Sequence, residues 1–310
     1  MKLANSVLIT GAAGFLGRYV SRQFAADGWR VVGVDCVPPD AVTVRPDATY
    51  HRLTLPDLGL GQLLAAERPK LCIHCAGRAS VPFSMEQPDV DFHDNMVMTF
   101  QLLDMLRRHV PGCRFILLSS AAVYGNPESL PVSESHRIAP LSPYGYHKRQ
   151  CELLCEEFAR VYGLQTASVR IFSAYGPGLR RQVLWDICER ILTNRELKLK
   201  GTGTESRDFI HAADVARALA LLAKVAPCEA DIYNLATGRE ITIRDLAKLI
   251  TTLLRPEMET AFDGAVRSGD PRNWRADISK VQALGFAPSI PLEQGIRTVA
   301  TWASAELAPR

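Results

Sequence analysis

Residues 6–17 read Ser6-Val7-Leu8-Ile9-Thr10-Gly11-Ala12-Ala13-Gly14-Phe15-Leu16-Gly17, an apolar run followed by a glycine-rich turn. The apolar run predicts a buried strand, and the residues from Leu16 onward have the periodicity of a helix. Glycines spaced G-x-x-G-x-x-G between a strand and a helix are typical of a loop whose backbone approaches a pyrophosphate. Because such a loop is a weak sign on its own, its meaning depends on the rest of the chain.

The first half of the chain alternates strand-like and helix-like segments. Strands are expected at 7–10, 31–35, 49–53, 71–75, 114–119 and 165–171, and helices at 16–26, 58–67, 89–108 and 143–162. This alternation predicts an α/β fold with a doubly wound parallel (Rossmann) sheet that carries helices on both faces.

The pattern changes after Phe172. Helices are expected at 181–193, 243–254, 277–284 and 292–302, and a strand at 231–235. We interpret this portion as a smaller α+β substrate-binding lobe. The expected division is a dinucleotide-binding domain of residues 1–172 with about 208–237, and a lobe of about 173–207 and 238–310.

Composition excludes several classes of protein. The 310 residues are 47% hydrophobic and carry a net charge of +3, with 36 basic and 33 acidic residues interspersed. This balance predicts no nucleic-acid and no membrane partner, and no apolar run approaches the roughly 18 residues of a membrane span. We expect a cytoplasmic protein. The Cys72-x-x-Cys75 pair lacks a second pair that could complete a metal site, so buried thiols and no metal are expected.

The expected second strand, Val31–Asp35, ends in a carboxylate. An acid at this place accepts hydrogen bonds from a ribose diol and repels a 2′-phosphate. Since no Arg or Lys immediately follows Asp35, the sequence favours NAD over NADP.

Tyr144 and Lys148 indicate a catalytic site, because their i, i+4 spacing puts a phenol and an ammonium on one helix face. A tyrosine that acts as a base near neutral pH needs a nearby positive charge. Ser120 follows an expected strand, at the carboxyl end where open α/β sheets bind ligands. Together with the glycine loop, these residues predict hydride chemistry on an alcohol carbon.

In these motifs the chain resembles the extended short-chain dehydrogenases/reductases, specifically the NAD-dependent nucleotide-sugar epimerase/dehydratase family and its UDP-glucose 4-epimerase-like members. The segments that carry the resemblance are Thr10–Gly17, His74–Gly77, Ser120–Gly125, Ser142–Tyr144 with Lys148, Arg170–Gly176, Arg207–His211 and Arg267–Asp270.

The resemblance implies a role for particular residues. The catalytic residues would be Ser120, Tyr144 and Lys148. The NAD contacts would come from Gly11, Gly14, Phe15, Leu16, Gly17, Asp35, Ala76, Gly77, Tyr144 and Lys148. A nucleotide-diphosphate sugar would be held by Ser80, Val81, Asn95, Ser120, Ser173, Arg207, Arg267 and Asp270. Ser173 stands where the family usually has Asn, which leaves the identity of the sugar open.

Three activities are compatible with this pattern. Dehydratases of the family carry an Asp-Glu pair where this chain has Ala121 and Ala122, which cannot move a proton. The favoured reaction is epimerisation at C4 through a transient 4-keto intermediate, with Tyr144 as the base. An NAD(P)H-dependent 4-keto-sugar-nucleotide reductase is the alternative. A catalytically silent NAD-binding regulator is a third, but such proteins typically lose the Tyr or the Lys.

Two expected helices carry apolar stripes, made of Met98, Leu102, Met105 and Leu106 on one and of Leu153, Leu154 and Phe158 on the other. Such a stripe can face the sheet or a partner subunit. The resemblance favours a homodimer joined by a bundle of two helices from each protomer.

Overall fold

The computed structural model describes residues 5–39, 49–55, 57, 59–194, 196–265 and 271–308. Among them, seven strands form one parallel sheet in the order β10-β6-β5-β4-β1-β2-β3. The strands are β1 (Ser6–Thr10), β2 (Arg30–Asp35), β3 (Thr49–Arg52), β4 (Leu71–His74), β5 (Arg114–Ser120), β6 (Thr166–Ile171) and β10 (Glu229–Leu235). The order reverses between β1 and β4, which is the place where doubly wound sheets bind ligands.

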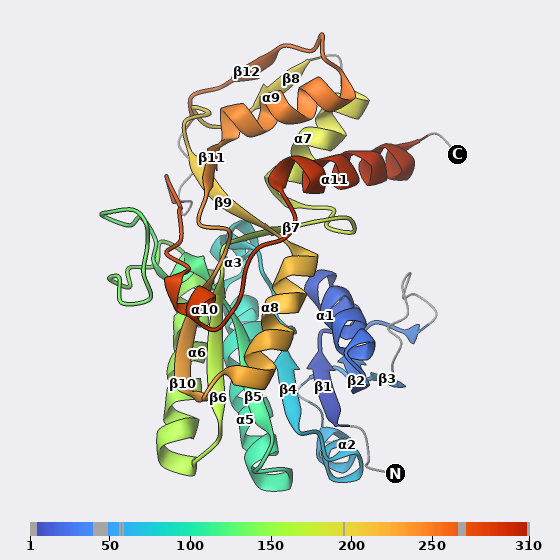
Figure 1. Cartoon of the computed structure of the whole chain (residues 1–310), viewed down its shortest axis with the longest axis vertical. Coiled ribbons are helices and arrows are strands. Elements are labelled where there is room, and N and C mark those ends of the chain that lie inside the picture. The colour runs from blue at the N-terminus through green and yellow to red at the C-terminus, as the bar shows by residue number, and fades with distance from the viewer. Residues whose placement is uncertain are drawn as a thin grey trace.

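Helices cover both faces of this sheet (Figure 1). One face packs against α1 (Phe15–Ala26) and α8 (Ala212–Val225), and the other against α2 (Gly59–Glu67), α5 (Met98–His109) and α6 (Pro143–Tyr162). Successive residues of a strand point to opposite faces. Accordingly, Val7 and Ile9 join the first apolar core while Leu8 joins the second. The predicted Rossmann sheet is confirmed.

The smaller lobe lies beyond the carboxyl ends of the strands (Figure 1). Its helices are α7 (Gln182–Thr193), α9 (Ile243–Leu254) and α11 (Leu292–Leu307). One sheet of three strands contains β7 (Ser173–Tyr175), β9 (Ser206–His211) and β11 (Glu240–Thr242), and one of two strands contains β8 (Leu197–Leu199) and β12 (Thr260–Phe262). They enclose a core of their own, in which Trp185 of α7 packs on Trp302 of α11. The short α10 (Ser279–Ala283) packs near β10.

The structure differs from the sequence-based expectation at three helices and at five short strands. Helix α3 (Val81–Glu86) and strands β7, β8, β9, β11 and β12 were not expected. The 14-residue α8 was not predicted, because its solvent-facing side is narrow and carries apolar Ala213 and Leu221 beside Arg217 and Lys224. The single helix expected at 89–108 is divided into α4 (Pro88–Phe92), a π-helical turn η2 (His93–Val97) and α5. No helix in the described parts of the chain is long and apolar enough to cross a membrane.

The apolar stripes face mainly inward. Leu102, Leu106, Leu154 and Phe158 are buried in the core between the sheet and its helices, so they are not a free surface. Of the residues that suggested an intersubunit bundle, Leu153 is exposed. The stripes therefore reflect packing within the protomer more than association between protomers.

Candidate active site

The glycine loop packs directly against the end of β4. Gly11 has a φ of +67°, and a Cβ there would lie 2.6 Å from the Ala76 nitrogen. A Cβ on Gly17 would lie 2.0 Å from the Gly11 carbonyl oxygen. Gly14 caps α1 without a side chain, so the first N–H groups of the helix, from Phe15 onward, face the loop. This cradle fits a dinucleotide pyrophosphate.

Asp35 lies beside the same loop at the end of β2. Its Oδ2 accepts a hydrogen bond from the Ala13 N–H at 3.0 Å, and its Oδ1 accepts one from the Val37 N–H at 3.2 Å. Two backbone donors thus fix the half-buried carboxylate, whose remaining lone pairs can accept from a ribose diol. The residues present fit NAD.

Asn95, which we expect near the floor of the site, lies in the π-helical turn. A Cβ on Gly77, whose φ is +126°, would lie 2.8 Å from Asn95 Oδ1. Asn95 is 1% exposed, and its Nδ2 donates to the carbonyl oxygens of Arg78 at 3.1 Å and Asp91 at 3.0 Å. Its Oδ1 has no hydrogen-bond partner among the described residues. Single π-helical turns are frequent at functional sites.

The residues expected to be catalytic meet where β5 ends and α6 begins. Ser142 caps α6 by accepting from the Gly145 N–H at 3.3 Å, which sets Tyr144 in the first turn. A Cβ on Gly145 would lie 2.6 Å from the Ala122 carbonyl oxygen, so this turn packs closely on η3 (Ala121–Val123), the turn that follows Ser120. Tyr144 is 8% exposed.

Lys148 is hydrogen-bonded to β5, the strand that ends in Ser120. Its Nζ donates to the Leu118 carbonyl oxygen at 2.9 Å. Ser120 Oγ accepts from the Ala122 N–H at 3.1 Å and keeps its own proton available. The arrangement therefore offers a phenol, a hydroxyl and a buried ammonium at one end of β5, next to the glycine loop.

A buried histidine, His74 of β4, links β1 to α5 next to this region. Thr10 Oγ1 lies 2.7 Å from His74 Nδ1, and Thr99 Oγ1 lies 3.2 Å from His74 Nε2. Burial, with a smaller contribution from the Lys148 ammonium, lowers the pKa of His74 from 6.5 to about 3. His74 is thus neutral at ordinary pH.

This shift predicts an acid-sensitive stability. Below pH 6.5 the unfolded chain binds a proton at His74, whereas the folded chain binds it only near pH 3. Folding free energy is therefore lost as pH falls through this window, at about 1.4 kcal/mol per pH unit. We expect His74→Asn to flatten the decrease in urea-unfolding free energy between pH 6 and pH 4.5 by up to roughly this slope. Parallel curves for the two proteins would contradict the assignment.

The smaller lobe approaches the site at two places. Arg181, which precedes α7, donates from Nη1 to the Ala79 carbonyl oxygen at 3.0 Å. Next to it, Ser80 caps α3 (Val81–Glu86) by accepting from the Phe83 N–H, and Val81 is the first residue of that helix. Ser173 begins β7, directly after β6.

The second place where the smaller lobe approaches the site is at Arg207. Its Nη1 donates to the carbonyl oxygens of Ser206 at 2.8 Å and Arg272 at 3.1 Å, and its guanidinium lies over Trp274. Trp274 Nε1 donates to the Gly125 carbonyl oxygen at 3.1 Å, close after η3. Arg267 and Asp270 lie outside the described residues.

Two buried ionic groups near the site were not predicted. Glu152 accepts from Arg170 Nε and Nη2, each at 2.8 Å, and from Ser119 Oγ at 2.6 Å, which binds α6 to β5 and β6. Asp208 accepts from the backbone of Thr237, Gly238 and Ala276 and so fixes β9. The signal was a charged residue inside a strand, at Arg170 and Asp208.

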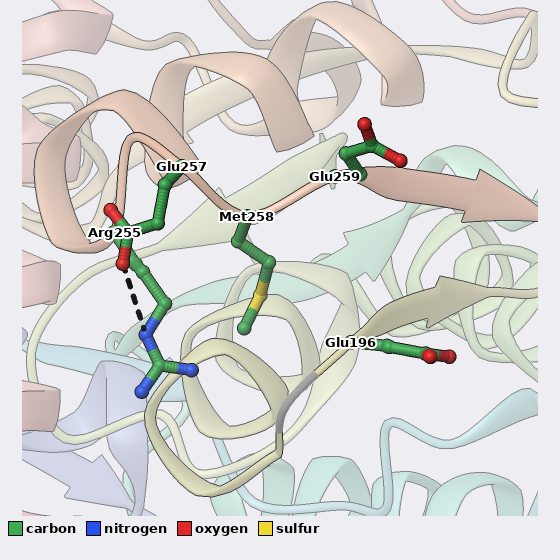
Figure 2. Close-up of a pocket in the computed structure, with 5 residues that line it drawn as sticks. All are labelled: Glu196, Arg255, Glu257, Met258 and Glu259. Atoms are coloured by element: carbon green, nitrogen blue, oxygen red, sulfur yellow. Dashed lines mark ion pairs between the residues drawn. The ribbon is translucent and has the colours of Figure 1, made fainter.

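A depression of about 450 Å³ is lined by Glu196, Arg255, Glu257, Met258 and Glu259. Figure 2 shows how these side chains lie. The depression lies in the smaller lobe, beside β8, α9 and β12, and involves none of the residues discussed above. Its polar lining is three carboxylates and one arginine, with Arg255 paired to Glu257 at 3.8 Å. Within the described residues, no cluster of His, Cys, Asp and Glu could hold a metal ion.

A glycine cradle at the sheet's reversal point, an acid at the tip of β2 and a Ser-Tyr-Lys set define a nucleotide-dependent α/β enzyme. Residues 7–236 match the model of the NAD dependent epimerase/dehydratase family. The chain belongs to this family and is an NAD-dependent enzyme of the epimerase class.

Known relatives align with this chain along almost its full length. A putative UDP-glucose 4-epimerase of Methanocaldococcus jannaschii is 30% identical over 301 residues, which cover 96% of this chain and 97% of the relative. The UDP-glucose 4-epimerase of Thermotoga maritima with UDP-glucose has a TM-score of 0.90 at 29% identity, covering 97% of this chain and 99% of that one. MoeE5 in complex with UDP-glucuronic acid and NAD has a TM-score of 0.89 at 30% identity, covering 98% and 100%.

Proposed function

We propose that this enzyme epimerises a UDP-linked sugar at C4 through a transient 4-keto intermediate, with Tyr144 as the base. The observation that carries the proposal is the placement of Tyr144 and Ser120 across the Gly145–Ala122 contact, beside Lys148 and the glycine loop. The 4-epimerase names of its relatives support the same reaction. Ala121 and Ala122 follow Ser120 and supply no acid or base for dehydration.

Each residue has a distinct task in this mechanism. Ser120 donates a hydrogen bond to the C4 oxygen and orients it. Tyr144 is the base that takes the proton of the C4 hydroxyl, and the Lys148 ammonium, whose Nζ donates to the Leu118 carbonyl oxygen, supplies a positive charge on the same helix. NAD, which the glycine loop and Asp35 would hold, would supply the acceptor for the C4 hydride and the means of returning it. The ketone turns its other face before that return, and Tyr144 then gives its proton back to the C4 oxygen.

The test is to incubate the purified protein with UDP-glucose and, separately, UDP-glucuronic acid, without added cofactor. We expect the C4 epimer of one of them, and NAD in the supernatant after denaturation, because an epimerase regenerates its cofactor in each turnover. A cofactor-free protein that only consumes reduced cofactor with a 4-keto sugar would identify a reductase instead.

We also propose that Arg207 and Arg267 bind the diphosphate and that Asp270 lies beside the nucleoside. Guanidinium groups suit phosphate oxygens. Since these contacts are remote from C4, they are made about equally in the ground and transition states.

Arg207→Ala should therefore raise KM by about tenfold or more and leave kcat within a few fold. Steady-state kinetics over a range of UDP-sugar concentrations measures both. A variant with unchanged KM and abolished kcat would refute this role.

Three further proposals concern organisation. The first is the division into a cofactor domain (1–172 with about 208–237) and a lobe (about 173–207 and 238–310), which is supported for β10 by its place in the seven-stranded sheet, whereas β9 pairs with β7 and β11 of the lobe. A cytoplasmic setting suits an enzyme of sugar nucleotides.

A homodimer is supported by exposed apolar residues on α3, α5 and α6, namely Met85, Phe100 and Leu153. A monomer mass by light scattering at micromolar concentration would count against the dimer.

A further inference from the structure

A buried carboxylate and a histidine lie directly beside the proposed catalytic residues without a part in the mechanism above. Asp91 of α4 is 0% exposed, and its Oδ2 lies 2.6 Å from Nδ1 of His147, which is 9% exposed. The His147 ring also packs edge-on against Phe92, with centroids 5.3 Å apart. The pair joins two elements that are far apart in the sequence.

The position of each partner relates the pair to the site. His147 lies on α6 between Tyr144 and Lys148. Asp91 lies one turn before Asn95, and its backbone carbonyl oxygen accepts from Asn95 Nδ2 at 3.0 Å. The pair thus connects the turn that bears the phenol and the ammonium to the turn that bears Asn95.

The pair carries an energetic cost that packing alone would not require. Asp91 Oδ1 has no hydrogen-bond partner in the described part of the chain, so the bond to His147 is the main compensation for burying this side chain. Apolar residues of similar volume often stabilise a protein equally well or better at such places. A buried polar pair that fixes one arrangement is therefore more consistent with a demand for position than with a demand for stability.

We propose that Asp91 and His147 are positioning residues, which hold the Tyr144–Lys148 turn of α6 against the Asn95 turn so that the phenol oxygen meets the reacting hydroxyl. This inference rests on the proposed function for the identity of the reaction. It requires that loss of the bond lowers the rate of the chemical step while the cofactor and the sugar still bind.

The chain allows a matched pair of variants at His147. In His147→Asn, the amide nitrogen takes about the place of Nδ1 and can donate to Asp91. In His147→Gln, the amide nitrogen takes the place of the other ring nitrogen, so the bond is lost although the chemical type is the same. His93→Gln, an exposed position on the adjacent η2 turn, controls for the substitution itself.

We expect His147→Gln to lower kcat by about 10- to 100-fold, since a displacement of about 1 Å can cost this much. KM and the NAD content should stay within about threefold. His147→Asn should recover most of kcat, and His93→Gln should match the wild type. Amide hydrogen exchange in residues 143–150 should become faster in His147→Gln but not in His147→Asn.

Two results would overturn the inference: an unchanged kcat in folded His147→Gln, or equal losses in the Asn and Gln variants. If the single variants do not fold, the apolar double variant Asp91→Leu/His147→Phe replaces them. It should keep a melting temperature near that of the wild type but lose kcat, and full activity in it would refute the proposal. The exchange comparison holds whatever the substrate is, so an inactive wild type on both UDP-sugars would count against the proposed function alone.

Discussion

Replacement of Tyr144 by Phe should lower turnover by about 10²- to 10⁴-fold, the usual contribution of general base catalysis. The substitution removes the proton acceptor but keeps the ring, which is 8% exposed and packed in the first turn of α6. NAD content should therefore stay at the wild-type level. Turnover of the UDP-sugar and NAD released on denaturation are the two measurements, and near wild-type turnover would overturn the mechanism.

Variants of the other two residues separate their roles from that of the base. Ser120→Ala should lose less than Tyr144→Phe, because it removes one hydrogen bond to the reacting oxygen while the base remains. Lys148→Ala removes the ammonium that donates to the Leu118 carbonyl oxygen at the end of β5, so it should lower turnover. It should also weaken NAD binding, since we propose that Lys148 contacts the cofactor.

The parts of the fold that the sequence predicts are those whose local pattern and final burial agree. Buried strands such as β1 and β5 are continuous apolar runs between turn residues, and their ends are predicted to within about a residue. Helix α8 was not predicted because it is buried against α1 and the sheet on most sides, and its narrow solvent-facing side mixes apolar and charged residues. The π-helical turn was not predicted because it spans five residues, too few for a change in the hydrophobic period to stand out.

The residues of the site also divide into those that a local pattern predicts and those that only the tertiary structure brings together. Gly11, Gly17 and the Tyr144–Lys148 spacing are local patterns, and the structure places them at the same end of the sheet. The Asp91–His147 bond spans 56 residues and the Arg170–Glu152 bond spans 18. No spacing rule links such residues before the strands and helices are arranged, so only the tertiary structure shows them.

The cofactor preference depends on such a tertiary arrangement as well. Asp35 was identified from its place at the end of a strand, but its register partner on β3 is Arg52, an exposed cation. Arg52 Nε donates to the Cys36 carbonyl oxygen at 3.3 Å, so the guanidinium lies near the tip of β2. Burial and then the Asp35 charge raise the pKa of the nearby Tyr50 to about 12, while Arg52 acts in the opposite direction. Both charges therefore act at the place where the adenosine ribose is expected.

The wild type should bind NAD more tightly than NADP by on the order of 100-fold or more, because a 2′-phosphate beside the fixed carboxylate meets a like charge in a partly buried site. Asp35→Asn keeps an oxygen that can accept from the Ala13 N–H but removes the charge. In that variant Arg52 can attract the 2′-phosphate, so NADP should gain affinity while NAD loses part of its own. Arg52→Ala in the Asp35→Asn background should cancel the gain for NADP and leave NAD little changed. Titration of both cofactors into the cofactor-free proteins decides the matter, and equal affinities in the wild type would refute the role of Asp35.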